Sequence, residues 1–286
     1  MPHTTTDDVA IWYEIEGPAD GEALVLISGG GAQLLAWQPG FLAPLVDAGF
    51  RVIRFDNRDT GMSQRFGGPD DLDGHYGLED MALDVVRILD SEGIDAAHVV
   101  GHSMGGIIAQ LLAIHHPERT RSITLVSTIP GTDPAWVVTP GLPEIYTRPQ
   151  EFHSRETVVE GSLKMQAWYH QGSDWNADAA RAIAELAYDR GYHPDGIPRQ
   201  WAALMRADYD RRGQLSRVTA PVLILHGRDD ETCHWKAALD TAEAVPDAEL
   251  HVYPGMGHLL VENLWPEYTG LIIRHARRAG RKDTHA

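Results

Sequence analysis

The sequence predicts an α/β fold in which helices flank a mostly parallel β-sheet and one helical segment interrupts the sheet. Short apolar runs alternate with helical patterns along most of the chain, as expected for repeated strand–helix units. Runs such as residues 23–27 are continuously apolar, which is typical of strands buried on both faces of a parallel sheet. After Ser127 the alternation stops, and residues 131–214 contain no run of this kind.

The first half of the chain predicts four strands and two helices. Residues 9–15 alternate loosely between apolar and polar side chains, whereas the later runs are nearly continuous. Residues 78–89 carry apolar side chains at helical spacing, and Gly93 is a suitable stop signal. A nearly all-apolar helix at residues 106–114 ends before Pro117. The four strands are expected at residues 9–15, 23–27, 51–55 and 97–100.

The second half predicts an insertion followed by a return of the strand–helix alternation. Residues 131–214 are rich in aromatic side chains and Pro/Gly turns and are interpreted as several helices. Ligands in open α/β sheets bind at the carboxyl ends of the strands, so an insertion here predicts a cap over those ends. We therefore expect a core of residues 1–130 and 215–286 and a helical cap (lid) of residues 131–214. Further strands are expected at residues 123–126, 221–225 and 249–253, and helices at residues 235–245 and 264–278.

The composition is that of a folded domain with a strong acidic excess. The 286 residues are enough for one large domain with an insertion. A net charge of −17 argues against nucleic-acid binding and would attract a cationic ligand, although solubility alone accounts for it. No apolar run approaches the roughly 20 residues that span a bilayer, and the first residues lack a secretory signal pattern. With Cys233 as the single cysteine, these features predict a cytoplasmic protein without disulfides.

The segment Gly101-His102-Ser103-Met104-Gly105 is the most informative motif of the chain. This G-x-S-x-G pentapeptide lies between an apolar strand and an apolar helix, and that context predicts a sharp turn with the serine hydroxyl exposed at its tip. The two glycines allow the bend, because a Cβ at either place would collide with the neighbouring strand or helix. We therefore expect Ser103 to be a nucleophile in a strained backbone conformation.

A serine nucleophile needs a base within hydrogen-bond reach and a third group that orients the base. In hydrolases with this type of nucleophile, the chain order is serine, carboxylate, histidine. His258 stands in a glycine-flanked loop after the strand at residues 249–253, so we expect it to be the general base. His102 is interpreted as a packing residue inside the turn, and His226 as a packing residue at the end of its strand.

The acid is not decided by the residues alone. Asp229, Asp230 and Glu231 follow the strand at residues 221–225 as adjacent alternatives. Asp133, beyond the strand at residues 123–126, is a more distant alternative. Each stands near the carboxyl end of a strand, which is the edge where Ser103 is expected.

The oxyanion of a tetrahedral intermediate needs backbone N–H donors. One donor is expected to be the amide of Met104, directly after the nucleophile at the start of a helix. The second is expected from the glycine run after the strand at residues 23–27. We assign it to Gly30, with Gly31 as the alternative.

These motifs together resemble the α/β-hydrolase superfamily over essentially the whole chain. Gly101–Gly106 is similar to its nucleophile elbow, and Gly255-Met256-Gly257-His258 to its histidine loop. The segment His226-Gly227-Arg228-Asp229-Asp230 is similar to its acid loop, and this implies that Asp230 is the triad acid. The resemblance also implies an α/β-hydrolase fold with an eight-stranded sheet and a helical cap inserted after strand 6.

Two further segments resemble the aclacinomycin methylesterase branch and related bacterial carboxylesterases. They are residues 55–63, Phe-Asp-Asn-Arg-Asp-Thr-Gly-Met-Ser, and Gly29-Gly30-Gly31, which stands in place of the common His-Gly pair. In that branch the second glycine donates to the oxyanion, which corresponds to Gly30. Ser28 stands where many relatives carry histidine, and the turn at Arg58-Asp59 is interpreted as structural.

The sequence thus predicts a serine esterase that cleaves a carboxylic ester through an acyl-enzyme intermediate. Its substrate would be a small-molecule ester, for which the branch resemblance suggests a bulky polyketide- or macrolide-like compound. Alternatives with the same triad are a perhydrolase, a lactonase or a C–C bond hydrolase, and a slow-turnover ligand receptor is an alternative of another class. We expect no cofactor, metal, nucleic acid or membrane partner, and homodimerisation stays open. The expected site consists of Ser103, Asp230 and His258 with the amides of Gly30 and Met104.

Overall fold

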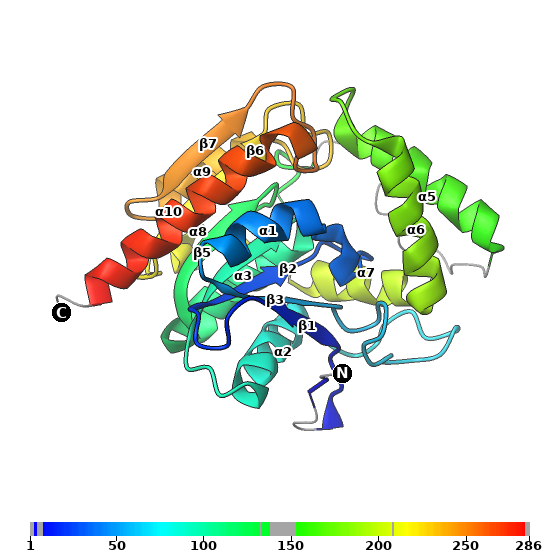
Figure 1. Cartoon of the computed structure of the whole chain (residues 1–286), viewed down its shortest axis with the longest axis horizontal. Helices are drawn as coiled ribbons and strands as arrows, with labels where there is room; N and C mark the ends of the chain where they lie inside the picture. The colour runs from blue at the N-terminus through cyan, green and yellow to red at the C-terminus, as the bar shows by residue number, and fades with distance from the viewer. Residues whose placement is uncertain (1–2, 5–7, 132, 138–152, 208, 284–286) are drawn as a thin grey trace.

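A single β-sheet organises the protein, whose computed structural model describes residues 3–4, 8–131, 133–137, 153–207 and 209–283. Within these residues, seven strands follow the order β1-β3-β2-β4-β5-β6-β7 (Figure 1). β1 runs antiparallel to β3, and every other neighbouring pair is parallel. The strands are β1 (Tyr13–Glu16), β2 (Ala23–Ile27), β3 (Arg51–Phe55), β4 (Ala97–His102), β5 (Thr120–Val126), β6 (Val222–Gly227) and β7 (Glu249–Tyr253).

The expectation of eight strands is wrong for the described part of the chain. The segment at residues 9–15 contributes only the short strand β1, and before it Trp12 forms an isolated bridge with His3. Of the described residues before Val9, Thr4 donates its N–H to the carbonyl of Ile11, so the pairing there is confined to one bridge. The helical insertion consequently follows β5, the fifth described strand, and not a sixth.

The central strands are buried on both faces, as their continuous apolar runs predict. All five residues of β2 are buried. Leu24 and Leu26 belong to one apolar cluster, whereas Val25 and Ile27 belong to the cluster on the opposite face. This division follows from the two-residue period of a strand, which directs successive side chains to opposite faces.

Helices cover both faces of the sheet. α1 and α10 contact each other and pack with Leu24 and Leu26, whereas α2, α3 and α9 contribute to the opposite cluster. α1 has no counterpart in the sequence predictions; its Pro39 stands in the first turn, where a missing N–H is tolerated. The bounds are α1 (Pro39–Asp47), α2 (Leu78–Ser91), α3 (Met104–His115), α9 (Lys236–Ala244) and α10 (Trp265–Asp283), with 3-10 turns η2 (Leu34–Ala36), η3 (Pro117–Arg119) and η4 (Glu262–Leu264).

Within its described residues, the segment between β5 and β6 holds four helices, and we call residues 131–214 the cap segment. The helices are α5 (Arg155–His170), α6 (Ala177–Gly191), α7 (Gly196–Arg206) and α8 (Arg212–Leu215). α5 and α6 pack side by side and extend away from the sheet, whereas α7 contacts α2 of the core (Figure 1). The exact division between core and cap remains a prediction, since residues 132, 138–152 and 208 lie outside the described part.

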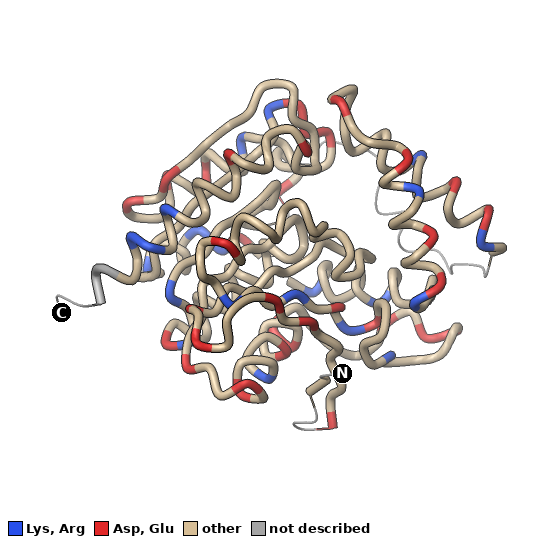
Figure 2. Tube along the Cα trace, viewed as in Figure 1, with Lys and Arg blue, Asp and Glu red and all other residues tan. Residues whose placement is uncertain are grey.

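Acidic residues are spread over the molecule and are mixed with basic ones on most elements (Figure 2). The net charge of −17 therefore does not arise from one long acidic run. Within the described ranges, none of the helices is both long and apolar enough to pass through a bilayer.

Candidate active site

Ser103 lies in the sharp turn between β4 and α3, as the motif predicts. Its backbone has φ +54° and ψ −120°, a region that residues with a side chain rarely occupy, at a typical cost of about 1–3 kcal/mol. The surrounding contacts enforce this conformation. A Cβ on Gly101 would lie 2.1 Å from the Gly105 carbonyl oxygen, and a Cβ on Gly105 would lie 2.3 Å from that of Ile27.

His258 follows β7 and is held by contacts on two sides. Its Nδ1 lies 2.8 Å from Oδ2 of Asp230. Its backbone N–H donates to the carbonyl of Tyr169, the next-to-last residue of α5, at 2.8 Å. A Cβ on Gly257 would lie 2.4 Å from the same carbonyl, so the glycine is needed for this close approach.

The structure separates the candidate acids by their surroundings. Asp230 is 4% exposed, and its Oδ1 accepts the backbone N–H groups of Thr232 at 2.8 Å and Cys233 at 2.9 Å. Asp229 is exposed, and its Oδ2 accepts the N–H of Gly255 at 2.8 Å, which ties together the acid and histidine loops. The carboxylate of Asp230 is thus the buried one that pairs with His258.

The remaining alternatives lie at the surface. Glu231 is exposed. Asp133 is also exposed, and its carboxylate accepts the N–H of Ala135 in its own turn.

The carboxylate of Asp230 stays ionised despite its burial. Burial raises its pKa, but the positive charge of His258 and hydrogen bonds from His226 and His258 outweigh that effect and hold the pKa far below its usual range. An ionised carboxylate at Oδ2 favours a proton on Nδ1 of His258. The opposite nitrogen, Nε2, is then free to accept a proton.

His102 and His226 take supporting positions around this pair. Nε2 of His226 lies 2.9 Å from the carbonyl oxygen of Cys233, and Nε2 of His102 lies 2.9 Å from that of His258. Burial, followed by the positive charge of His258, lowers the pKa of His102 to about 4. His102 is therefore neutral near pH 7 and places no second charge beside the candidate base.

A cavity of about 110 Å³ is lined by the expected site residues other than Asp230. Ser103, His258, Gly30 and Met104 all line it. Met104 is the first residue of α3, whose N–H has no partner inside the helix. A Cβ on Gly29 would lie 3.3 Å from that of Ser103, so the glycine run packs directly against the nucleophile turn.

The structure distinguishes Gly30 from Gly31. The N–H of Gly31 donates to Oε1 of Gln200 at 2.8 Å and is therefore occupied. No hydrogen bond from the N–H of Gly30 occurs within the described residues, and Gly30 lines the cavity. The arrangement thus favours Gly30 as the donor.

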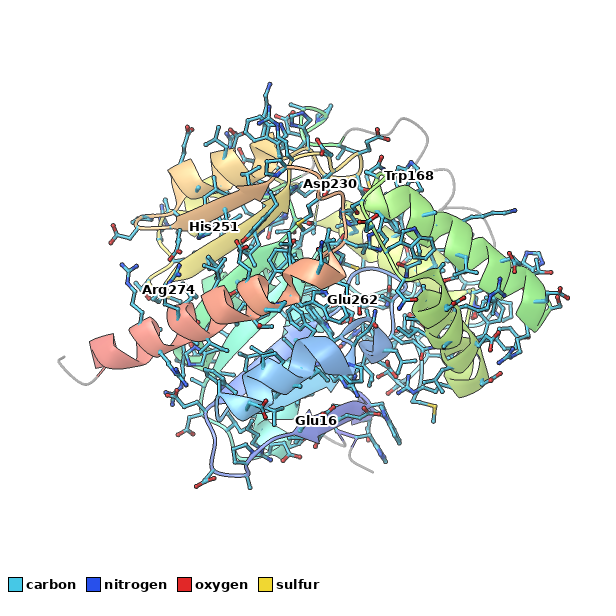
Figure 3. All side chains as sticks on the ribbon, turned by 45° about the horizontal axis from the view of Figure 1, so that its top comes forward. Glu16, Trp168, Asp230, His251, Glu262 and Arg274 are labelled. Atoms are coloured by element: carbon cyan, nitrogen blue, oxygen red, sulfur yellow. The ribbon has the colours of Figure 1, made fainter. Side chains whose placement is uncertain are left out.

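The cap segment contributes cavity residues that the sequence analysis did not identify. Among them are Tyr169 from α5 and Ile197, Gln200, Trp201 and Leu204 from α7. Gln200 lies 169 positions from its hydrogen-bond partner Gly31, and no motif marks either residue for this contact. Figure 3 shows Trp168, at the same end of α5, beside the loop that carries Asp230.

A second cavity of about 130 Å³ reaches the nucleophile turn at His102. His102 lines it, whereas its neighbour Ser103 lines the first cavity. Trp37, Phe41 and Trp265 form the core side of the second cavity, and His170 and Trp175, stacked at 5.5 Å, form part of its cap side.

One group of potential metal ligands coincides with the candidate site. Atoms of Asp230, Cys233 and His258 lie within 4.8 Å of one another, the single such group in the described residues. The hydrogen bonds of Asp230 to His258 and to the Cys233 amide already account for this arrangement. Burial raises the pKa of the Cys233 thiol, which disfavours the thiolate that a metal ion would require.

Known proteins resemble this chain over most of its length. Residues 22–263 match the family described as alpha/beta hydrolase fold. A putative carbamate hydrolase, RutD of Variovorax paradoxus, is 34% identical over 86% of this chain and 88% of its own. Rhodomycin D methylesterase DnrP of Streptomyces peucetius is 30% identical over 96% of this chain and 97% of its own. The crystal structure of a hydrolase from Pseudomonas aeruginosa PA01 superposes with a TM-score of 0.77 at 25% identity, over 95% and 96% of the two chains.

Proposed function

Because the chain belongs to the α/β-hydrolase fold family, we propose that it is a serine hydrolase that cleaves a carboxylic ester through an acyl-enzyme intermediate. The observation that carries the proposal is the 2.8 Å contact between Asp230 and His258, in a cavity that also contains the strained Ser103. The similarity to rhodomycin D methylesterase supports an ester as the bond that is cleaved.

In the first half-reaction, the hydroxyl of Ser103 attacks the ester carbonyl while Nε2 of His258 accepts its proton. Asp230 keeps the other ring proton on Nδ1 and stabilises the imidazolium that forms. The amides of Gly30 and Met104 donate to the oxyanion of the tetrahedral intermediate. His258 then returns the proton to the leaving alcohol, and Ser103 keeps the acyl group.

In the second half-reaction, water takes the place of the alcohol. His258 removes a proton from the water, the resulting hydroxide attacks the acyl carbonyl, and the same two amides hold the oxyanion. Collapse of the intermediate releases the carboxylic acid and returns the proton from His258 to Ser103. In each half-reaction His258 accepts one proton and then returns it. The enzyme therefore ends each cycle in its starting state.

We assign a bulky aromatic ester as the substrate class, and the two cavities support this choice. The 110 Å³ cavity beside Ser103 holds the scissile ester with its small alcohol, such as a methoxy group. The 130 Å³ cavity is lined by aromatic rings that suit a planar ring system. A polyketide-like acid esterified with a small alcohol would place one part in each cavity.

Carbamate hydrolysis is a second candidate, supported by the relative named as a putative carbamate hydrolase. A carbamate carbonyl would be attacked by the same Ser103 and held by the same amides. The carbonyl carbon of an ester is bonded to a carbon and an oxygen, whereas that of a carbamate is bonded to a nitrogen and an oxygen. A panel of both substrate classes therefore separates the two candidates.

The decisive test of the mechanism replaces Ser103 by Ala and measures hydrolysis of p-nitrophenyl acetate and butyrate. We expect a loss of about 10⁶ in kcat, as for removal of other serine nucleophiles. The parent should also show a burst of one p-nitrophenol per chain and bind a fluorophosphonate covalently. Ser91→Ala, an exposed serine at the end of α2, is the matched control. Activity of S103A within tenfold of the parent would refute the mechanism, and labelling without turnover of any substrate would indicate a receptor.

The substrate class is tested with a panel of methyl esters, carbamates and lactones, assayed with and without peroxide. We expect the highest kcat/KM for methyl esters of polycyclic aromatic acids. The quantity to compare is kcat/KM for a polycyclic ester divided by kcat/KM for p-nitrophenyl acetate. Trp175→Ala should lower this ratio, because Trp175 lines the second cavity and not the first. An unchanged ratio would exclude the second cavity as the ring site.

A further inference from the structure

Gln200 links the cap segment to the glycine loop beside Ser103. Its side chain is 2% exposed and uses both ends of its amide. Oε1 accepts the N–H of Gly31 at 2.8 Å, and Nε2 donates to the carbonyl of Arg58 at 2.7 Å. One side chain of α7 therefore joins the loops that follow β2 and β3.

The hydrogen bond to Gly31 acts on the peptide next to the proposed oxyanion donor. The N–H of Gly31 belongs to the peptide plane that begins at Gly30, so its bond to Gln200 limits rotation at Gly30. Gly31 has φ +71°, and three successive glycines would otherwise sample many backbone conformations. An oxyanion donor has to be held in position before the reaction, because ordering a mobile amide during the reaction would raise the activation free energy.

The helix that carries Gln200 is itself firmly anchored. The neighbouring Arg199 is completely buried and pairs with Asp59 at 2.8 Å and with Asp195 at 3.0 Å. The same guanidinium donates to the carbonyls of Gly68 and Asp71, both at 2.9 Å. Asp59, Gly68 and Asp71 belong to the core, so their bonds with Arg199 anchor α7 beside Gln200.

The same helix also touches the glycine loop through apolar contacts. A Cβ on Gly31 would lie 3.3 Å from Cγ1 of Ile197. Ile197, Trp201 and Leu204 line the cavity that contains Ser103. α7 thus forms a wall of the cavity and at the same time holds the loop that supplies the oxyanion donor.

From these contacts we propose that Gln200 is a positioning residue, which holds the Gly30–Gly31 peptide so that the Gly30 N–H faces the oxyanion. The proposal rests on the proposed function, since it requires an oxyanion at Ser103. Gln200 acts through Gly31 and does not itself donate to the substrate. Its effect should therefore appear in transition-state stabilisation and not in binding of the ester.

The test compares Gln200→Met with Gln33→Met. Methionine approximates the shape of glutamine without its hydrogen bonds. Gln33 is a matched control because its Nε2 also bonds to the cap segment, at the carbonyls of Ala187 and Gly191, without contacting the Gly31 N–H. Kinetics with p-nitrophenyl acetate should show kcat of Q200M reduced about 10- to 100-fold, with KM within about twofold, because misplacing a donor costs part of its full contribution.

A transition-state analogue provides a readout that a general loss of stability would not change. The inhibition constant of phenylboronic acid, which forms a tetrahedral adduct with the serine, should rise by the same factor as kcat/KM falls. Binding of the neutral analogue benzamide, which forms no oxyanion, should stay within about twofold of the parent. Q33M should leave the ratio of the two inhibition constants unchanged.

The outcomes separate this proposal from the proposed function. Suppose that S103A is inactive while Q200M keeps kcat within threefold of the parent, or changes KM alone. The positioning role is then wrong and the esterase mechanism stands. If S103A retains activity, the mechanism itself fails. Gln200→Leu repeats the measurement should Q200M not fold, as judged by circular dichroism. Failure of both variants to fold would assign Gln200 to the structural core and contradict the proposal.

Discussion

Replacing Asp230 by Asn tests the orientation of the proposed general base, His258, with the smallest change in shape. Oδ1 of Asp230 accepts two backbone N–H groups, those of Thr232 and Cys233. An asparagine keeps both bonds only if its carbonyl oxygen takes the Oδ1 position. Its NH₂ group must then face Nδ1 of His258, where Oδ2 now lies at 2.8 Å.

An NH₂ group in that place requires Nδ1 to accept a hydrogen bond. The single proton of the neutral imidazole then moves to Nε2, which can no longer accept the proton of Ser103. The opposite amide orientation would set NH₂ against two N–H donors and lose both bonds. We therefore expect D230N to lose about 10⁴ in kcat, which corresponds to about 5.4 kcal/mol of transition-state stabilisation.

The assay is steady-state hydrolysis of p-nitrophenyl acetate, together with the ¹⁵N chemical shifts of the His258 ring. We expect the shifts to report a proton on Nδ1 in the parent and on Nε2 in D230N. Asp229→Asn is the control, because its exposed side chain retains an oxygen for the Gly255 N–H. The reasoning is refuted if D230N keeps more than a tenth of the activity, or if D229N loses more than D230N.

Three further predictions concern stability and are measured by urea denaturation. Gly105→Ala should lower the free energy of unfolding by about 1–3 kcal/mol or prevent folding, because the new Cβ would lie 2.3 Å from the Ile27 carbonyl oxygen. A variant as stable as the parent would contradict this. Burial lowers the pKa of His98 to about 4, so the unfolded chain binds a proton that the folded one excludes. Stability should fall by about 1–3 kcal/mol as the pH drops from 6.5 toward 4, and His98→Gln should reduce this slope. Arg199→Met should cost about 3–5 kcal/mol by leaving Asp59 buried without its partner, and a loss below 1 kcal/mol would argue against that pair.

The sequence predicted best the features that depend on neighbouring residues. The strands at residues 23–27, 51–55 and 249–253 have the expected bounds, because their apolar runs are continuous and bordered by turns. An approach of one of the acids after residues 221–225 to His258 was also predicted, since both loops follow parallel strands whose ends share one edge of the sheet. The choice of Asp230 over Asp229 came from family resemblance, and the structure gives its physical reason in the burial of Asp230.

The features that were not predicted from the sequence depend on contacts between distant segments. α1 was missed because Pro39 and Pro44 weaken its helical pattern, although packing against α10 compensates. Gln200 was missed because its role arises only when α7 docks on two core loops. The resemblance implied eight strands, whereas the sheet of the described residues has seven and His3 joins Trp12 only through an isolated bridge.

The contacts of the cap segment argue that it determines rate as well as specificity. The Tyr169 carbonyl holds the backbone of His258, and Gln200 holds Gly31. At the end of α6, Arg190 pairs with the buried Asp56 at 3.1 Å, and the other carboxylate oxygen of Asp56 accepts the N–H of Leu34. Since these helices also line the cavities, a substitution that reshapes the pocket will displace a catalytic loop. Changes of substrate preference introduced in α5 or α7 should therefore alter kcat for small esters that never touch the substituted residue.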